Sequence, residues 1–343
     1  IAEYIKNLHL SENYQKFPTY YQIYEFVAQK FKKYIYTDTL RHIIREKLGH
    51  LFKSVVGIPM EENRMAVSLD DIEKNIEELK QKIEGVPTKF VFNLDEVGYE
   101  EFCDAHEMHV IVPIDYKLQT APYAINRRKR TSVLACISCD SFEIIPQFTV
   151  TRTTIDSEIY KYLPASQINV VNTQKGYITS YSFQIWFSNI FLPYLRDLRQ
   201  KNNYNGQTVL ILDGYAPHFR AIQHFNLAAE KLTLHFLVPH SSHMMQPLDL
   251  CIFSVMKNIQ CNYDWLSNVS QQTKEIIKHH NSLFGAAKPV NCKSSFRATG
   301  IVAKTKVVDG KIVETAHFDV TQCKNISYYQ LSYIEEKIQK IFH

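Results

Sequence analysis

The stretch TVLILDGYAPH, residues 208–218, decides the fold. Its first five side chains are apolar or β-branched without interruption, which is typical of a strand buried on both faces. The run stops at Asp213, after which Gly214 and Pro217 require a turn and His218 begins a helical stretch. Because a carboxylate at the carboxyl end of a buried strand faces the crevice where open α/β sheets bind ligands, Asp213 is a candidate functional residue. The alternative is a loop aspartate that caps the next helix.

Two further aspartates occupy comparable positions. The stretch FVFNLDEVG, residues 90–98, is a second apolar run that stops at a carboxylate, Asp95. Asp249 follows a third predicted strand, 233–238, and the pair Gln246-Pro247 indicates a helix start just before it. Asp249 is thus expected in the first helical turn, where simple complementation of the helix dipole is the alternative to a functional role.

Three separated aspartates at the ends of elements predict a metal site. Mg²⁺ binds few protein carboxylates and keeps waters or substrate phosphates in its other positions. Two such ions about 3.5–4 Å apart can activate an attacking oxygen and stabilise a leaving oxygen on phosphorus. Three carboxylates with a shared member suffice to hold both. We therefore expect Asp95, Asp213 and Asp249 to be the catalytic, metal-binding residues, with two Mg²⁺ (or Mn²⁺) ions as cofactors.

The rest of this region alternates between strands and helices. Strands are expected at 131–138 and 142–150, joined by a short turn, whereas 151–180 is polar and reads as irregular. Apolar residues at helical spacing predict a helix over 182–200, which Pro193 would kink. This alternation indicates an α/β fold with a mixed sheet flanked by helices.

The N-terminal segment has a different pattern, in which two short helices are expected at 20–32 and 37–48, with Gly49 after the second. A helix, a short turn and a helix with a basic outer face is the form of a helix-turn-helix, although any pair of antiparallel helices gives the same pattern. The expected inner positions are Ile23, Phe26, Val27, Phe31, Leu40, Ile43, Ile44 and Leu48. Thr37 or Asp38 is the expected N-cap of the second helix. The candidate DNA contacts are Thr37 and the outward cations of that helix, Arg41, Arg45 and Lys47.

The charge distribution supports a polyanion partner for this segment. The formal net charge is +4, from 39 Lys+Arg and 35 Asp+Glu, and residues 1–60 carry the whole excess. A second basic run, at 127–130, is expected to be a solvated loop, and the alternatives are contact with phosphate or a nuclear import signal. Its members are Arg127, Arg128, Lys129 and Arg130.

Other site classes receive less support. No apolar run approaches the ~18 residues of a membrane span, so no membrane partner is expected. Cys136 and Cys139 are three positions apart on an expected strand and point to opposite faces, which argues against a zinc site and favours reduced thiols. His240 and His243 could be metal ligands, but a polar loop is the simpler interpretation.

With these motifs in place, the sequence resembles the pogo branch of the mariner-type transposases, which includes Tigger-like and centromere-protein-B-like relatives. The resemblance lies in DGYAPH at 213–218 and in LVPHSSHMMQPLD, which ends at Asp249 after 35 intervening residues. The stretch 90–98 resembles the family's first catalytic strand, 176–195 its central helix, and SFRATGI, 295–301, the segment that closes its catalytic domain. Residues 18–50 resemble the second helix-turn-helix of its DNA-binding region.

This resemblance implies a ribonuclease-H-like mixed sheet flanked by helices and preceded by an all-α helix-turn-helix domain. It implies the same metal-binding aspartates, with Glu96 and His218 as auxiliary residues, while Val97 departs from the Thr or Ser usual in the family. The N-terminal region is short for the family and the chain begins with Ile1, so a first DNA-binding subdomain is expected to be missing.

The expected domains are a helix-turn-helix domain at 1–60, a linker with a helix at 61–88, a catalytic domain at 89–305 and a tail at 306–343, with a helix near 328–342. The leading hypothesis is a nuclear DNA transposase that cuts transposon ends and transfers the 3′ hydroxyl to target DNA, working on double-stranded DNA as a homodimer. The alternatives are a domesticated, catalytically silent DNA-binding protein of the same ancestry and a metal-dependent phosphoesterase.

Overall fold

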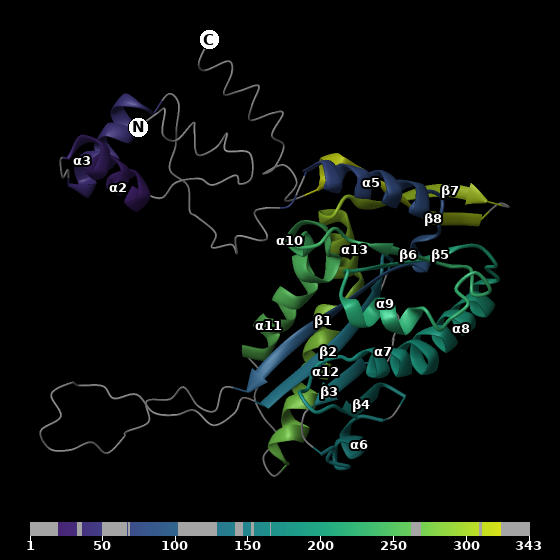
Figure 1. The fold of residues 1–343 in the computed structure, drawn as a ribbon. Helices are drawn as coiled ribbons and strands as arrows, with labels where there is room; N and C mark the ends of the chain where they lie inside the picture. The colour runs from purple at the N-terminus through teal and green to yellow at the C-terminus, as the bar shows by residue number, and fades with distance from the viewer. Residues whose placement is uncertain are drawn as a thin grey trace, which may run out of the picture. The chain divides into compact units, whose positions relative to one another are not determined.

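We analysed a computed structural model of the chain, shown in Figure 1. The described residues are 20–32, 36–49, 67, 69–101, 129–140, 147–151, 154–164, 166–261, 269–308 and 311–323. The chain divides into two units, one of residues 1–73 with 326–343 and one of residues 74–325. Each unit is described by itself.

The first unit contains the two helices expected at the N-terminus, α2 (Tyr20–Phe31) and α3 (Thr37–Lys47). They pack through a small apolar core made of Ile23, Val27, Leu40 and Ile44. Two expectations were wrong in detail. Phe31 is 55% exposed, because it is the last residue of α2 and lies beyond the contact with α3. The residue before α3 is Tyr36, without a side-chain cap, so Thr37 begins the helix and does not cap it.

The second unit is built on a six-stranded mixed sheet, in the order β4-β3-β2-β1-β5-β6 (Figure 1). Strands β1, β2 and β3 run antiparallel to one another in turn, whereas β5 runs parallel to β1, β6 to β5 and β4 to β3. The bounds are β1 Val91–Glu101, β2 Lys129–Ser138, β3 Gln147–Thr151, β4 Ile168–Asn172, β5 Thr208–Leu212 and β6 Leu232–Phe236. The mixed α/β sheet flanked by helices is thus confirmed.

The two apolar runs of the sequence form the central strands. All five residues of β5 are buried, as its unbroken pattern predicted. β1 does not stop at Asp95 but continues to Glu101, because β2 pairs with it from Phe92 to that end. Its parallel pairing with β5 ends earlier, at Asn93 opposite Ile211. After Asn93, the edge of β1 that faces β5 is therefore unpaired with β5, although β1 itself continues.

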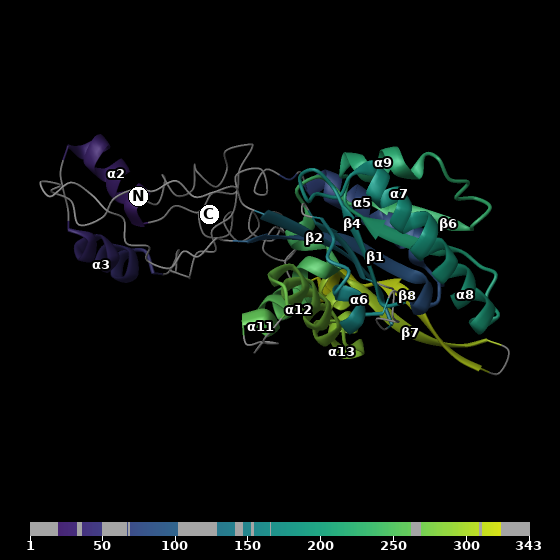
Figure 2. The same cartoon turned by 90° about the horizontal axis from the view of Figure 1, so that it is seen from below.

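Helices cover both faces of the sheet, as Figure 2 shows. On one side lie α7 (Ser180–Trp186), α8 (Leu192–Asn202) and α9 (Ala216–Ile222), and on the other α11 (Phe253–Cys261), α12 (Gln271–Ala286) and α13 (Pro289–Ala298). Shorter elements are α6 (Ile159–Tyr162), α10 (Ser242–Met245), η1 (Thr88–Phe90), η2 (Phe187–Phe191), η3 (Leu248–Ile252) and η4 (Val320–Gln322). β1 reaches both layers, since Phe92 packs on Phe191 and Tyr99 stacks on His279 of α12.

The long helix predicted at 182–200 is interrupted by a π-helical segment, η2, between α7 and α8. Pro193 stands in the first turn of α8 and cannot donate a hydrogen bond, so the irregular turn lies just before it. The strand β4 was missed within 151–180, because its sequence INVVN is short and stands between polar residues. Thr179 and Ser182 form a capping box that fixes the start of α7.

Two elements lie close to the predicted segment boundaries. The helix placed in the linker, α5 (Leu69–Ile83), is tied to the sheet, because Asn75 donates to the carbonyl oxygen of Phe236 at 2.8 Å. A boundary at 305/306 would cut β7 (Ile301–Val308), which pairs with β8 (Lys311–Phe318) as a hairpin. The helix predicted near 328–342 lies outside the described residues.

Two further sequence expectations concern charge and hydropathy. Lys129 and Arg130 form the start of β2, opposite Glu101 and Glu100, so this half of the basic run is strand and not loop. Residues 127 and 128 lie outside the described residues. Within the described part of the chain, no helix combines the length and hydrophobicity that a membrane span requires.

Candidate metal centre

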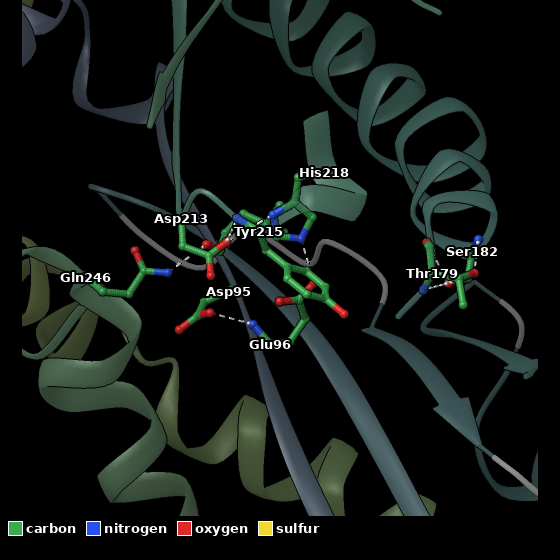
Figure 3. A network of polar contacts seen from close by, with 9 residues as sticks. Asp95, Glu96, Thr179, Ser182, Asp213, Tyr215, His218 and Gln246 are labelled. Carbon is green, nitrogen blue, oxygen red and sulfur yellow. Dashed lines mark hydrogen bonds and ion pairs between the residues drawn. The ribbon is translucent and has the colours of Figure 1, made fainter. Parts of the chain in front are cut away.

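Parallel pairing brings Asp95 and Asp213 to the same level of the sheet. Asn93 lies opposite Ile211 in the last matched pair of β1 and β5, and each aspartate lies two residues beyond its member of that pair. The carboxyl ends of parallel strands meet at one edge, so two residues far apart in sequence become neighbours. Figure 3 shows Asp95 and Asp213 side by side at this edge.

Alternation along β1 separates Asp95 from Glu96. Successive residues of a strand point to opposite faces. Asp95 therefore shares the face of Tyr99, which contacts α11 and α12, whereas Glu96 shares the face of Phe92, which packs on the α7–α8 layer. Asp213 lies just beyond the end of β5 and faces His218 of α9.

Asp249 comes to the site from a third element. It is an exposed residue in the first turn of η3, as the Gln246-Pro247 pair predicted. The segment before it is fastened to β1, because the Leu248 backbone N–H donates to Asn93 Oδ1 at 3.0 Å. Asp249 is thereby held on the sheet next to the strand that carries Asp95.

The carboxylates of Asp249, Glu96 and Asp213 act electrostatically on Asp95. Burial raises the pKa of Asp95 well above its ordinary value, and the negative charges of Asp249, Glu96 and Asp213 raise it further. One hydrogen bond, from the Glu96 backbone N–H to Asp95 Oδ1 at 2.8 Å, acts in the opposite direction. Four carboxyl groups from three elements thus concentrate negative charge at one point, which is an arrangement that a cation would stabilise.

A buried histidine partly neutralises this charge. His218 of α9 is fully buried, and its Nε2 lies 2.7 Å from Glu96 Oε1 while its Nδ1 lies 3.1 Å from Asp213 Oδ1. The second contact is an ion pair whose geometry falls short of an aligned hydrogen bond. Burial alone would lower the pKa of His218, but Asp213 and Glu96 outweigh it and raise the pKa to about 10. His218 is therefore a cation that bridges two carboxylates (Figure 3).

The donor atoms suit a hard divalent cation. Glu96, Asp213 and His218 offer ligand atoms that all lie within 4.8 Å of one another. Both nitrogens of His218 already face carboxylates, and Mg²⁺ prefers oxygen, so the fitting donors within this group are the carboxylates of Glu96 and Asp213; among the described residues, Asp95 and Asp249 are not members of it. His218 carries one positive charge, whereas several carboxylates lie around it. Divalent ions could therefore neutralise the remaining negative charge.

Replacing His218 with phenylalanine is expected to destabilise the metal-free protein by about 3 kcal/mol at pH 7, because Glu96 and Asp213 lose their buried counter-charge. The folded-state pKa lies above the ordinary value, so this stabilisation is complete below about pH 6.5 and is lost as pH rises through about 10. Urea unfolding between pH 6 and 10 measures the difference. His224→Phe, at an exposed histidine, is the control. A gap between parent and His218→Phe that does not shrink at high pH would contradict the prediction.

The other sequence candidates lie elsewhere. Cys136 and Cys139 are buried free thiols. His240 is exposed and precedes α10, whereas His243 lies within α10 and its Nδ1 is 3.1 Å from the carbonyl oxygen of His240, so the polar-loop interpretation holds only for His240. Arg41 and Arg45 are exposed on α3, with 61% and 78% of their side-chain surfaces accessible.

Sequence analysis missed two residues beside the site, Asn93 and Gln246. Both side chains are fully buried, and they hydrogen-bond to each other at 2.9 Å. The sequence did contain a signal for Asn93, because it is a polar residue inside the apolar run 90–94, which was predicted to be a buried strand. Buried polar groups almost always have hydrogen-bond partners, so such a residue calls for a partner of matching polarity.

Solved structures of Mos1 transposase complexes are similar to this chain in fold. The Mos1 transposase paired-end complex with left transposon end matches with a TM-score of 0.50 and 13% identity, over 87% of this chain and 74% of that chain. The Mos1 mariner paired-end complex with Mn gives a TM-score of 0.49 and 12% identity, over 81% and 71%. The first likeness confirms the expected ribonuclease-H-like fold. A search of curated proteins gave no match.

The sequence model of the DDE superfamily endonuclease family matches residues 127–302. The matched segment is just over half of the chain and contains Asp213 and Asp249, whereas Asp95 precedes it and is placed by the pairing of β1 with β5. Sequence and fold agree, and the chain belongs to the DDE superfamily endonuclease family.

Proposed function

We propose that the chain is a DNA transposase, which cuts phosphodiester bonds at transposon ends and transfers the 3′ hydroxyl to target DNA. The observation that carries the proposal is the convergence of Asp95, Asp213 and Asp249 from three elements at one edge of the sheet in a DDE-family endonuclease. The similarity of the fold to a Mos1 transposase complex with a transposon end supports DNA as the substrate.

The three aspartates are the proposed ligands of two Mg²⁺ or Mn²⁺ ions, with Asp213 as the ligand that both ions share. When bound, a divalent cation supplies charge stabilisation at the attacking and leaving oxygens of the phosphodiester. Glu96 and His218 hold Asp213 from the α9 side, so they orient a ligand and limit the local negative charge. Mos1 has been solved in complexes with Mn and with Mg.

The direct test is cleavage of DNA that carries the ends of the encoding element, compared in Mg²⁺ and in EDTA. We expect nicks at the element ends in Mg²⁺ and none in EDTA. Binding of the same DNA without cleavage in either Mg²⁺ or Mn²⁺ would contradict the proposal and would favour a domesticated DNA-binding protein. Cleavage that persists in EDTA would remove the metal from the mechanism.

DNA recognition is assigned to α2 and α3, with α3 entering the major groove through Arg41 and Arg45. Thr37 and Lys47 at the ends of α3, and the basic run 127–130, are proposed phosphate contacts. The same proposal places the protein in the nucleus and two copies of it on paired transposon ends.

Arg41→Ala and Arg45→Ala are each expected to weaken binding to element-end DNA by about 1–3 kcal/mol if the side chain contacts a base edge. Their exposed partners, Asp38 and Glu46, leave the guanidinium groups accessible to DNA. Fluorescence anisotropy at two salt concentrations measures affinity and its salt dependence. Lys30→Ala, an exposed cation on α2, is the control. Unchanged affinity and salt dependence in both arginine variants would refute the assignment.

A further inference from the structure

The buried amides Asn93 and Gln246 lie close to candidate metal ligands in the sequence. Asn93 precedes Asp95 by two residues and shares its face of β1, while Gln246 precedes Asp249 by three residues. Neither amide side chain reaches solvent. Because an unsatisfied buried amide costs about 1–3 kcal/mol, the hydrogen-bond partners of these two residues decide their role.

The two amides form one hydrogen-bonded network that joins β1, β5 and the segment ahead of η3. Asn93 Nδ2 donates to the carbonyl oxygen of Ile211 at 3.1 Å and to Gln246 Oε1 at 2.9 Å. Gln246 Nε2 donates to the carbonyl oxygen of Leu94 at 2.9 Å, and Asn93 Oδ1 accepts from the Leu248 N–H at 3.0 Å. Figure 3 shows Gln246 reaching toward the strand that carries Asp95.

These bonds hold the backbone on both sides of Pro247. Gln246 and Leu248 are fully buried, whereas the next residue, Asp249, is exposed. Burial of Asp249 itself therefore does not fix its position. Leu248 also supplies the first backbone donor after Gln246, because Pro247 has none. The network accordingly sets where the first turn of η3 starts on the sheet.

We propose that Asn93 and Gln246 form a positioning clamp that sets the distance of Asp249 from Asp95 and Asp213, and so determines the affinity of the site for divalent cations. The proposal rests on the proposed function, since it takes these aspartates to be metal ligands. Residues behind metal ligands commonly control affinity in this way, because a ligand must stand within a few tenths of an ångström of its productive place.

A purely structural role makes a different prediction. If the two amides serve only the stability of the core, replacing both with apolar side chains of similar shape should lower the stability, because the Leu248 N–H and the carbonyl oxygens of Ile211 and Leu94 lose these partners, but it should leave the affinity for Mn²⁺ unchanged. The Asn93→Leu/Gln246→Met double variant makes that replacement. A clamp instead predicts that this variant folds but binds metal poorly.

The experiment is titration of the metal-free full chain with Mn²⁺, in which the electron paramagnetic resonance signal of free Mn²⁺ reports binding without any need for activity. We expect the double variant to bind Mn²⁺ about 10–100-fold more weakly than the parent under conditions in which it is folded, and its thermal midpoint should fall because the buried Leu248 N–H loses its acceptor. Gln260→Met is the matched control, because Gln260 is also a buried amide, bonded to His279 away from the site. It should bind Mn²⁺ like the parent.

A second variant covers the case in which the double variant fails to fold. Gln246→Asn keeps the amide but shortens it by one methylene, so it should not reach both Asn93 and the Leu94 carbonyl, and Mn²⁺ affinity should fall. Parental affinity in a folded double variant, or in Gln246→Asn if the double variant does not fold, overturns the clamp. Absence of Mn²⁺ binding by the parent overturns both the clamp and the metal site. Binding by the parent without DNA cleavage counts against the proposed function alone.

Discussion

Asp213→Asn is expected to lower the rate of DNA cleavage in Mg²⁺ by about 10²–10³-fold or more. Asparagine keeps the size of the side chain but removes one negative charge from the carboxylates that would hold the ions. Asp213 is the proposed shared ligand, so both ions lose a partner. Affinity for element-end DNA should barely change, because recognition is assigned to α2 and α3 in the other unit. Single-turnover cleavage and anisotropy on the same DNA measure the two quantities separately.

The control for this variant is Asp197→Asn, which removes a carboxylate from the exposed surface of α8, where Asp197 pairs with Lys201. Cleavage by that variant should match the parent. If Asp213→Asn cuts DNA at the parental rate, Asp213 is a loop residue without a catalytic role, and the interpretation of residues 208–218 is wrong. If the parent itself never cuts, the domesticated interpretation gains support.

The sequence predicted the central strands because their signal is local. Residues 90–94 and 208–212 are apolar without a break, and in the structure they lie side by side at the middle of the sheet. Placement of Asp95 and Asp213 at one edge follows from parallel pairing, which the apolar runs already suggested. The helical start before Asp249 was also readable, since Gln246-Pro247 marks it directly.

Other features depend on partners that the sequence does not reveal. The continuation of β1 past Asp95 depends on pairing with β2, and the opposite orientations of Asp95 and Glu96 follow only once that strand is continuous. The bond between Asn93 and Gln246 joins residues 153 positions apart, so no local pattern could specify it. The basic run 127–130 was read as one loop, but pairing with Glu100 and Glu101 draws Lys129 and Arg130 into the sheet.

Asp95→Asn is expected to lower the rate of DNA cleavage by as much as Asp213→Asn and yet to stabilise the metal-free protein, by about 1 kcal/mol or ~2–4 °C in melting temperature. Burial and the charges of Asp249, Glu96 and Asp213 raise the pKa of Asp95, so its ionised form costs free energy in the folded state. Asparagine removes that cost and can still accept the Glu96 N–H through its oxygen. Differential scanning calorimetry in EDTA measures the change.

The sign of the effect follows from linkage. A carboxyl group with a raised folded-state pKa contributes stability at low pH, and the contribution is lost as pH rises from the ordinary value through the raised one. The parent should therefore lose stability over that range, whereas Asp95→Asn should not. Added Mg²⁺ at 100 times its Kd should stabilise the parent by about 2.7 kcal/mol and the variant much less.

Asp213→Asn should move the metal-free protein in the other direction, because Asp213 is a partner of the buried His218 cation and its loss leaves that charge with Glu96 alone. Asp95→Asn and Asp213→Asn are both expected to slow cleavage, but they are thus predicted to change the stability of the metal-free protein with opposite signs. If the substitutions simply impaired folding, both variants would be less stable than the parent. If the two aspartates were loop residues without interactions, the stability of neither variant would change. Opposite signs are expected only if Asp95 carries an uncompensated charge that a metal must neutralise while Asp213 is already paired with His218.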